Sequence, residues 1–308
     1  DTTVVFEDDF GVAAAVLIDR LRAYALASGY SVISSPSFSR EGKIRHIIIK
    51  ELSLGFFTAD NIASEMGVEK HSKYRINAGI IHCLNEAGLE GHTYLPENIL
   101  LSRASLALNI EEKFIKEQLL PLASEQSVIM REIEGVRSVY HPSYFYAEAI
   151  VAGTLISLAG SNNGEKEKAL IKEIEAYEKT KKITLAPNQR EAVISAINNG
   201  ITIITGGPGT GKTTTLDCIL HLFRKRGLAI SLAAPTGRAA KRMATATGED
   251  AKTIHRLLEY TRLDEGGFVF KRNKDNPLKA DVLVVDEASM IDIFLMQALL
   301  EGLQKGTR

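Results

Sequence analysis

The sequence predicts an α/β protein in which a phosphate-binding domain with a parallel sheet follows a mostly helical region. After residue 183, short apolar runs alternate with helix-forming segments, a pattern typical of a doubly wound parallel sheet with crossover helices. Residues 58–124 instead predict short helices separated by caps and breakers. With 308 residues, 45% of them hydrophobic and 24% charged, the chain is long enough for two or three compact units and is neither disordered nor fibrous.

The first 160 residues are expected to form two parts of different character. Residues 1–55 predict a small α/β segment of unclear origin, to which no chemistry can be attached. Residues 56–160 predict a helical region that ends in a two-stranded wing over residues 128–142, because apolar residues alternate there around a glycine. The elements expected in these parts are a helix at 12–28, strands at YSVIS and HIIIK, and helices at 58–66, 73–87, 95–108 and 111–124.

A charged helix is expected to connect this region to the rest of the chain. Residues 161–182 follow a glycine and asparagine break and place their apolar side chains on one side of a helix. Residues 183–308 are then expected to form the phosphate-binding domain. Its expected strands lie at 201–205, 229–235 and 282–285, its helices at 212–226, from Gly237 and at 291–303, and a small hairpin or exposed insertion at 264–277.

Charge and cysteine content narrow the class of protein. Residues 181–308 hold 19 Lys and Arg against 13 Asp and Glu, a net +6, so residues 1–180 hold 18 against 25, a net −7. The basic half is compatible with a polyanionic partner, although solvated helix faces give similar counts. Cys83 and Cys218 lack metal-ligand spacing and are expected to be reduced structural thiols. The chain starts at Asp1 among acidic residues and has no apolar run of about 20 residues, so we expect a cytoplasmic protein without a membrane span or signal peptide.

The most informative motif is GGPGTGKT, which follows an apolar run and precedes a helix-forming segment. It is a complete G-x-x-x-x-G-K-[ST] loop, whose backbone amides can surround phosphate oxygens where no Cβ intervenes. Lys212 is expected to reach the β and γ phosphates, and the Thr213 hydroxyl is expected to bind Mg²⁺. The expected nucleotide-binding residues are Gly207, Pro208, Gly209, Thr210, Gly211, Lys212, Thr213 and Thr214.

A second acidic motif, DEAS, follows the apolar run VLVV. Such a run fits a strand that is buried on both faces of a parallel sheet, so both carboxylates emerge at its carboxyl end. Asp286 is expected to hold Mg²⁺ through water, and Glu287 to polarise the attacking water. Lys212, Asp286 and Glu287 are therefore the candidate catalytic residues. The alternative is an acidic pair that caps the helix starting near Ser289.

Three further stretches carry candidate binding residues. Gln189 lies 23 residues before Lys212, where a side-chain amide can read the adenine edge with a paired donor and acceptor. AAPTGRAA follows a strand and opens a helix, a position suited to phosphate contacts. KTIHRLL precedes the expected insertion. The candidate contacts from the last two stretches are Pro235, Thr236, Arg238, Thr253 and His255, each of which could also be an ordinary cap or surface residue.

Taken together, these motifs match in order and spacing the first motifs of superfamily 1 DNA helicases, and the sequence resembles the RecD-like group. GFFTADNIASEMGV and HPSYFYAEAIVA resemble the helix-hairpin-helix and winged-helix-like region that precedes the motor in that group. The resemblance implies a RecA-like ATPase domain, ATP and Mg²⁺ as cofactors, and single-stranded DNA and duplex junctions as partners. It also implies 5′-to-3′ movement with unwinding, in DNA repair or recombination, and DNA contacts by the five residues named above.

The resemblance also implies a second RecA-like domain, which supplies an arginine for phosphoryl transfer and is absent after DEASMIDIFLMQALLEGLQKGTR. We therefore expect nucleotide binding with slow hydrolysis, and no unwinding, from these 308 residues alone. Two alternatives remain open: a clamp-loader-like ATPase, and a DNA-binding adaptor that uses ATP as a conformational switch.

Overall fold

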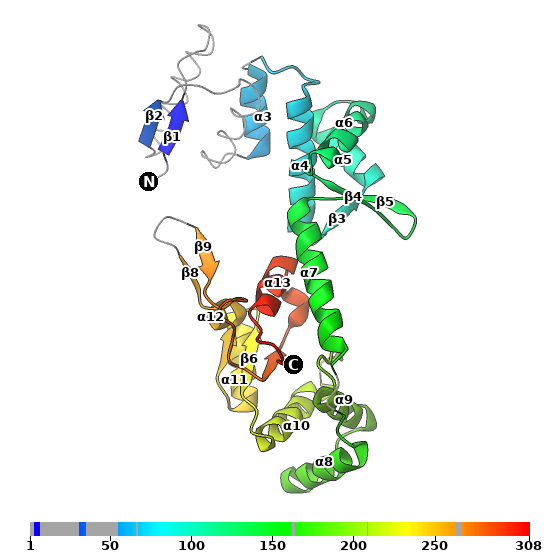
Figure 1. Cartoon of the computed structure of the whole chain (residues 1–308), viewed down its shortest axis with the longest axis vertical. Coiled ribbons are helices and arrows are strands. Elements are labelled where there is room, and N and C mark those ends of the chain that lie inside the picture. The colour runs from blue at the N-terminus through cyan, green and yellow to red at the C-terminus, as the bar shows by residue number, and fades with distance from the viewer. Residues whose placement is uncertain are drawn as a thin grey trace. The chain divides into compact units, whose positions relative to one another are not determined.

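The computed structural model describes the backbone of two short strands near the start of the chain, then residues 55–65, 67–161, 164–207, 209–262 and 267–308 (Figure 1). The chain divides into two compact units, Asp1–Phe145 and Tyr146–Arg308. The two early strands, β1 (Thr3–Phe6) and β2 (Ser31–Ser34), pair in parallel. β2 lies within the expected YSVIS strand, whereas β1 was not expected. The helix expected at residues 12–28 and the strand expected at HIIIK lie outside the described residues.

The first unit is mostly helical and carries a small antiparallel sheet, as expected. Its helices are α3 (Phe56–Glu65), α4 (Lys73–Leu89), α5 (Glu97–Leu108) and α6 (Glu112–Ser124). Its strands β3 (Tyr94–Pro96), β4 (Ile129–Ile133) and β5 (Val136–Tyr140) pair in the order β3-β5-β4, and β4 and β5 form the expected wing (Figure 1). Glu134 and Gly135 between them have φ of 49° and 79°, as a tight hairpin turn with two left-handed residues requires.

One buried ion pair holds three helices of this unit together. The Arg75 guanidinium in α4 donates to both carboxylate oxygens of Asp60 in α3, from Nε to Oδ1 at 2.9 Å and to Oδ2 at 3.1 Å, and from Nη2 to Oδ2 at 2.7 Å. Nη2 also donates to the Leu108 carbonyl at the end of α5, at 2.9 Å. The pair lies beside an apolar core that includes Ile80 and Ile115, each fully buried. The fork geometry satisfies both charges where water is largely excluded.

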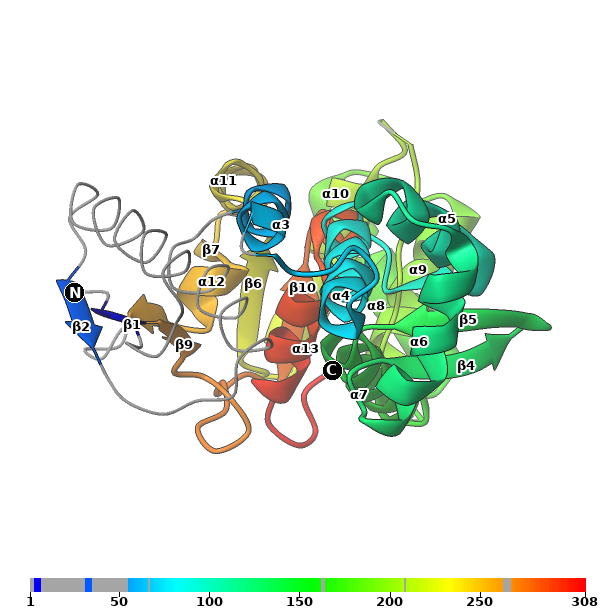
Figure 2. The same cartoon turned by 90° about the horizontal axis from the view of Figure 1, so that it is seen from above.

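The second unit contains a parallel sheet of three strands with helices on both faces. Strands β10 (Val282–Val285), β6 (Ile230–Ala234) and β7 (Ala251–Thr253) pair in that order (Figure 2). The helices of the unit are most of α7 (Pro142–Ala159), then α8 (Glu167–Lys181), α9 (Pro187–Asn198), α10 (Lys212–Lys225), α11 (Gly237–Thr247), α12 (Ile254–Leu257), the 3₁₀ turn Ala288–Met290, and α13 (Ile293–Glu301). The fold class expected from the sequence is confirmed.

Alternating side chains of β10 explain why both faces of the sheet are covered. Val282 and Val284 pack with the apolar face of α10, whereas Leu283 and Val285 pack with Leu295 of α13. Successive residues of a strand point to opposite faces, so the continuous apolar run VLVV fits a strand that is buried on both sides. A hairpin is present near the insertion expected at residues 264–277, but it begins earlier: β8 (Tyr260–Arg262) precedes that range and pairs antiparallel with β9 (Phe268–Phe270) inside it.

The strand expected at residues 201–205 is not formed. Within the described chain this run pairs with no strand, and Ile203 is 81% exposed. A parallel strand needs a neighbouring strand to accept and donate its hydrogen bonds. The edge of β10 away from β6 is contacted by Arg308, whose carbonyl accepts from the Leu283 N–H at 2.8 Å and whose N–H donates to the Asp281 carbonyl at 3.0 Å. Residues 201–205 therefore lack the partner that a strand requires.

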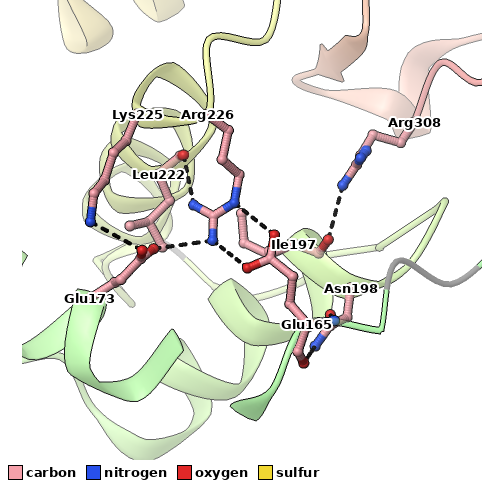
Figure 3. A network of polar contacts seen from close by, with 8 residues as sticks. All are labelled: Glu165, Glu173, Ile197, Asn198, Leu222, Lys225, Arg226 and Arg308. Carbon is pink, nitrogen blue, oxygen red and sulfur yellow. Dashed lines mark hydrogen bonds and ion pairs between the residues drawn. The ribbon is translucent and has the colours of Figure 1, made fainter. Parts of the chain in front are cut away.

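Helix α8, which the sequence indicates as a connector, packs in the core of the second unit. Leu170, Ile174 and Tyr177 lie in one cluster with Val193 of α9 and Cys218 of α10. Polar contacts also join this segment to the end of α10, where Arg226 donates to Glu165 from Nε at 2.8 Å and from Nη2 at 2.6 Å (Figure 3).

The expected domain boundaries stay a prediction. Over the described residues, no helix is both long and apolar enough to cross a bilayer.

We predict that Ile174→Ala lowers the free energy of unfolding by about 2–5 kcal/mol, because it leaves a cavity beside α9 and α10. Ile156→Ala, at a position of α7 that is 73% exposed, is the matched control and is expected to change the stability by less than about 0.5 kcal/mol. Urea denaturation followed by circular dichroism measures both. Equal effects of the two substitutions would contradict the assignment of α8 to the core.

Candidate nucleotide site

The phosphate loop, residues 206–213, leads directly into α10, which begins at Lys212. Gly209 and Gly211 have φ of 76° and 80°, values that side chains other than glycine rarely adopt. Thr210 Oγ1 donates to the Gly207 carbonyl at 2.9 Å and closes the turn. Pro208 lies outside the described residues. The loop therefore has a conformation that requires glycine at two positions, and it ends at the N-terminus of α10, the end of a helix that favours anions.

The candidate side chains at the end of the loop and the start of α10 differ in their exposure to solvent. Lys212 is exposed, and its Nζ donates to the carbonyl of Gly206 and, at 3.1 Å, to that of Gly207. Thr213 is also exposed, while Thr214 is half-buried. Thr215 is buried, and its hydroxyl donates back to the Gly211 carbonyl at 3.1 Å. Lys212 thus bends back over its own loop and donates to two of its carbonyls.

Gln189 contacts the phosphate loop, although 23 residues separate it from Lys212. Its Nε2 donates to the Thr210 carbonyl at 3.0 Å, and its Oε1 accepts from the Ala186 N–H at 2.8 Å. A Cβ on Gly211 would lie 2.3 Å from Nε2, so no other residue fits at position 211 without moving Gln189. Each end of an amide has capacity for a second hydrogen bond, so Gln189 keeps one donor and one acceptor for a ligand.

Asp286 and Glu287 follow the carboxyl end of β10. The Asp286 N–H donates to the Ala233 carbonyl at 3.0 Å, and the Glu287 N–H donates to Asp286 Oδ1 at 3.0 Å. Glu287 adopts a left-handed φ of 54°, which is uncommon for a residue other than glycine. Glu287 occupies the N-cap position of the 3₁₀ turn Ala288–Met290, but its side chain makes no capping hydrogen bond. The next helix, α13, is capped by Asp292, whose Oδ1 accepts from the Leu295 N–H at 2.8 Å.

Sequence reasoning missed Arg242 of α11. Its Nη2 donates to Glu287 Oε1 and lies 3.5 Å from Asp286 Oδ2. The hydrogen bond to Glu287 raises the pKa of the guanidinium, and the charges of both carboxylates add to this effect. Arg242 lies four residues after Arg238, on the same face of one helix. A second arginine one helical turn after Arg238 was the signal that the sequence offered.

Thr236 and Thr253, which are both expected to bind DNA, each cap the N-terminus of a helix. Thr236 Oγ1 accepts from the Ala239 N–H at the start of α11, and Thr253 Oγ1 accepts from the Arg256 N–H at the start of α12, both at 3.2 Å. A capping hydroxyl retains its own donor for a ligand. Pro235 is half-buried and Arg238 is exposed.

His255 belongs to an aromatic cluster that the sequence did not indicate. Its ring lies 5.3 Å from that of Tyr260 and 5.9 Å from that of Phe270. The rings of Tyr260 and Phe268 are parallel to within 9°, with centroids 5.1 Å apart. Tyr260 is 44% and Phe268 61% exposed. The signal was FVF, in which two aromatic residues stand two apart and so share one face of a strand, eight residues after Tyr260.

The register of the parallel sheet brings several candidates to one edge. Val285 of β10 pairs with Ala233 of β6, and Ala234 pairs with Thr253 of β7, so the three strands end together. The acidic pair, Pro235 with Thr236, and Thr253 with His255 follow those three ends. The phosphate loop makes a separate set of hydrogen bonds, to itself and to Gln189. In the part of the chain that the structure describes, no group of three or more His, Cys, Asp or Glu side chains could hold a metal ion.

Comparisons with known proteins match both halves of the chain. The AAA domain family matches residues 189–308, and the family described as the ATP-dependent RecD2 DNA helicase HHH domain matches residues 46–94. The chain is 30% identical over 275 residues to the ATP-dependent RecD2 DNA helicase of Deinococcus radiodurans, which covers 83% of this chain and 36% of that protein.

Shorter matches lie in RecD subunits of the RecBCD enzyme. The chain is 40% identical over 143 residues to the subunit of Mycolicibacterium smegmatis, covering 39% of this chain and 26% of that one. It is 38% identical over 144 residues to the subunit of Haemophilus influenzae, covering 39% and 22%. The chain thus spans 36% or less of the length of these three relatives. One relative aligns with most of this chain, and family matches fall in both its helical and its phosphate-loop regions, so the chain is similar to RecD-like DNA helicases in both regions.

Proposed function

We propose that this chain carries the ATP-binding and part of the DNA-binding machinery of an ATP-dependent DNA helicase. In this proposal, ATP hydrolysis drives 5′-to-3′ movement along single-stranded DNA and duplex unwinding, in DNA repair or recombination. The contact between Gln189 and the phosphate loop carries the proposal, because it joins a base-reading amide to a loop suited to phosphates. The name of the Deinococcus relative, a DNA helicase, supports the same activity.

The residues present fit a magnesium nucleotide. A Cβ added at Gly207 or Gly209 would meet nothing within 4 Å, so the loop leaves open space above its backbone. Lys212, Thr213 and Asp286 offer an ammonium group, a hydroxyl and a carboxylate, which are the groups that phosphates and Mg²⁺ prefer. Mg²⁺ usually takes few protein ligands besides phosphate oxygens and water, so a larger cluster of carboxylates is not needed. When bound, the ion would neutralise charge on the phosphates.

Each residue has a distinct proposed role. Lys212 holds the β and γ phosphates, Thr213 binds Mg²⁺ directly, and Asp286 binds it through water. Glu287 orients and polarises the attacking water. Arg242 neutralises both carboxylates in the structure, so metal binding would compete with this contact.

We predict that Lys212→Ala weakens the binding of magnesium ADP by about 10- to 100-fold, because a charge-assisted hydrogen bond to phosphate contributes about 1.5–3 kcal/mol. Isothermal titration calorimetry measures the affinity. Lys225→Ala, at the other end of α10 and paired with Glu173 at 3.0 Å, is the matched control and should bind ADP like the unchanged chain. Equal affinities for all three proteins would remove Lys212 from the site.

For DNA, we propose that Pro235, Thr236, Arg238, Thr253 and His255 contact the backbone and bases of a single strand. The face of the β8–β9 hairpin that carries Tyr260, Phe268 and Phe270 also carries Arg262, since these positions alternate along paired strands. Exposed aromatic rings beside a cation suit stacking on bases without sequence readout, with the cation near phosphate. The aromatic cluster therefore extends the proposed contact from His255 to the hairpin. We further propose residues 56–160 as a second DNA-binding region.

We predict that Tyr260→Ala weakens binding of single-stranded DNA by about tenfold, because stacking on one base contributes about 1–3 kcal/mol. The measurement is fluorescence anisotropy with a labelled oligonucleotide and with an abasic strand of equal length. The loss should vanish on the abasic strand, and the salt dependence should be unchanged, because no phosphate contact is removed. Tyr260→Phe keeps the ring and should bind normally. A loss of the same size on both strands would mean that Tyr260 does not stack on bases.

A further inference from the structure

Glu178, near the end of α8, is a buried carboxylate with only 7% of its surface exposed. It accepts three hydrogen bonds. Its Oε1 accepts from the Leu185 N–H at 2.7 Å and from Arg190 Nε at 3.1 Å, and its Oε2 accepts from Arg190 Nη2 at 2.6 Å. A buried charge is tolerated only where it is paired and hydrogen-bonded in this way. The two groups that it holds, Leu185 and Arg190, lie on either side of Gln189.

These contacts fix both ends of the segment that presents Gln189. At one end, the Leu185 side chain is buried in the core with α8 and α10, and its N–H is bound to Glu178. At the other end, Arg190 follows Gln189 in the first turn of α9. The Gln189 amide then spans from the Ala186 N–H to the Thr210 carbonyl of the phosphate loop. A shift of this segment would move the amide relative to the loop.

We propose that Glu178 and Arg190 position the Gln189 amide and thereby set the preference of the site for adenine over guanine. This inference rests on the proposed nucleotide site. Adenine presents a donor at N6 beside an acceptor at N7, which matches one amide, whereas guanine presents two acceptors at the corresponding atoms. The match requires the amide plane to be held in place, because a hydrogen bond weakens steeply when its angle falls. Glu178 and Arg190 act through Gln189 and do not touch the nucleotide.

Glu165 provides a matched control within the same unit. It also precedes the P-loop in sequence, and it also accepts a forked pair of hydrogen bonds from one arginine, Arg226, as Figure 3 shows. The hydrogen bond from Arg226 lowers the pKa of Glu165. Its neighbours are Asn198 and the end of α10, not Gln189. Losing such a fork without displacing Gln189 is the effect that Glu165→Gln reports, at a carboxylate that is more exposed than Glu178.

The test measures the affinities of the 308-residue chain for magnesium ADP, GDP and pyrophosphate by calorimetry. Pyrophosphate reports on the phosphate loop alone, and the ratio of the ADP and GDP affinities reports on the base. We expect the unchanged chain to prefer ADP by about tenfold or more. Glu178→Gln and Arg190→Met should each lower this preference at least about threefold and weaken pyrophosphate binding by a smaller factor than ADP binding, because the Gln189 amide also contacts the loop. Combining them should add no further loss, because both break one link. Glu165→Gln should change neither quantity.

Other outcomes overturn the proposal in distinguishable ways. If Gln189→Ala removes the preference for ADP while Glu178→Gln and Arg190→Met keep it, the nucleotide site stands and the positioning role is wrong. If Glu178→Gln weakens ADP, GDP and pyrophosphate binding alike, Glu178 only stabilises the fold. If the unchanged chain binds none of the three ligands, the proposed nucleotide site itself fails, and the positioning role fails with it.

Discussion

The register of the parallel sheet is the constraint on which most of the candidate site depends. Because β10, β6 and β7 run in the same direction and end level with one another, the residues that follow them meet at one edge. The acidic pair follows one strand, and Thr236 and Thr253 follow the other two. A slip of one residue would turn each apolar side chain of β10 to the opposite face, so the packing of α10 and α13 on the two faces also fixes this edge.

Local signals in the sequence predicted the helices of the first unit, the wing and the glycine-dependent loop, because caps, periodicity and turn residues act over a few positions. These local signals do not predict contacts between residues that lie far apart in the sequence. Residues 201–205 have the composition of a buried strand, but a strand forms only beside a neighbour, and Arg308 contacts the open edge of β10. The partners of Arg242 and of the apolar side of α8 could not be predicted for the same reason: they lie far along the chain. Gln189 could be predicted because its position 23 residues before Lys212 can be read directly from the sequence.

The charged groups of the candidate site have partners within the protein. Lys212 donates to carbonyls of its own loop, and Arg242 donates to Glu287. Both contacts are exposed to solvent, where water competes for the same groups and such contacts are weak. When a ligand binds at such a site, Lys212 would exchange a neutral carbonyl for a charged phosphate oxygen, and the carboxylates would exchange Arg242 for a divalent ion. In both cases a weak partner is replaced by one that carries more charge. Buried pairs such as Asp60 with Arg75 would resist this exchange, and they lie in the core of the helical unit.

The absence of strand pairing at residues 201–205 gives Gln189 a second role. In a phosphate loop that follows a paired strand, the sheet holds the loop on its N-terminal side. Here the described chain shows no such pairing, and Ile203 is largely exposed. The loop is held on its C-terminal side by α10, which packs on Val282 and Val284, and on its other side by the hydrogen bond from Gln189 to Thr210. Since α9 in turn packs against α8 and α10 through Val193 and Ile197, the position of the loop depends on the helices behind it as much as on the sheet.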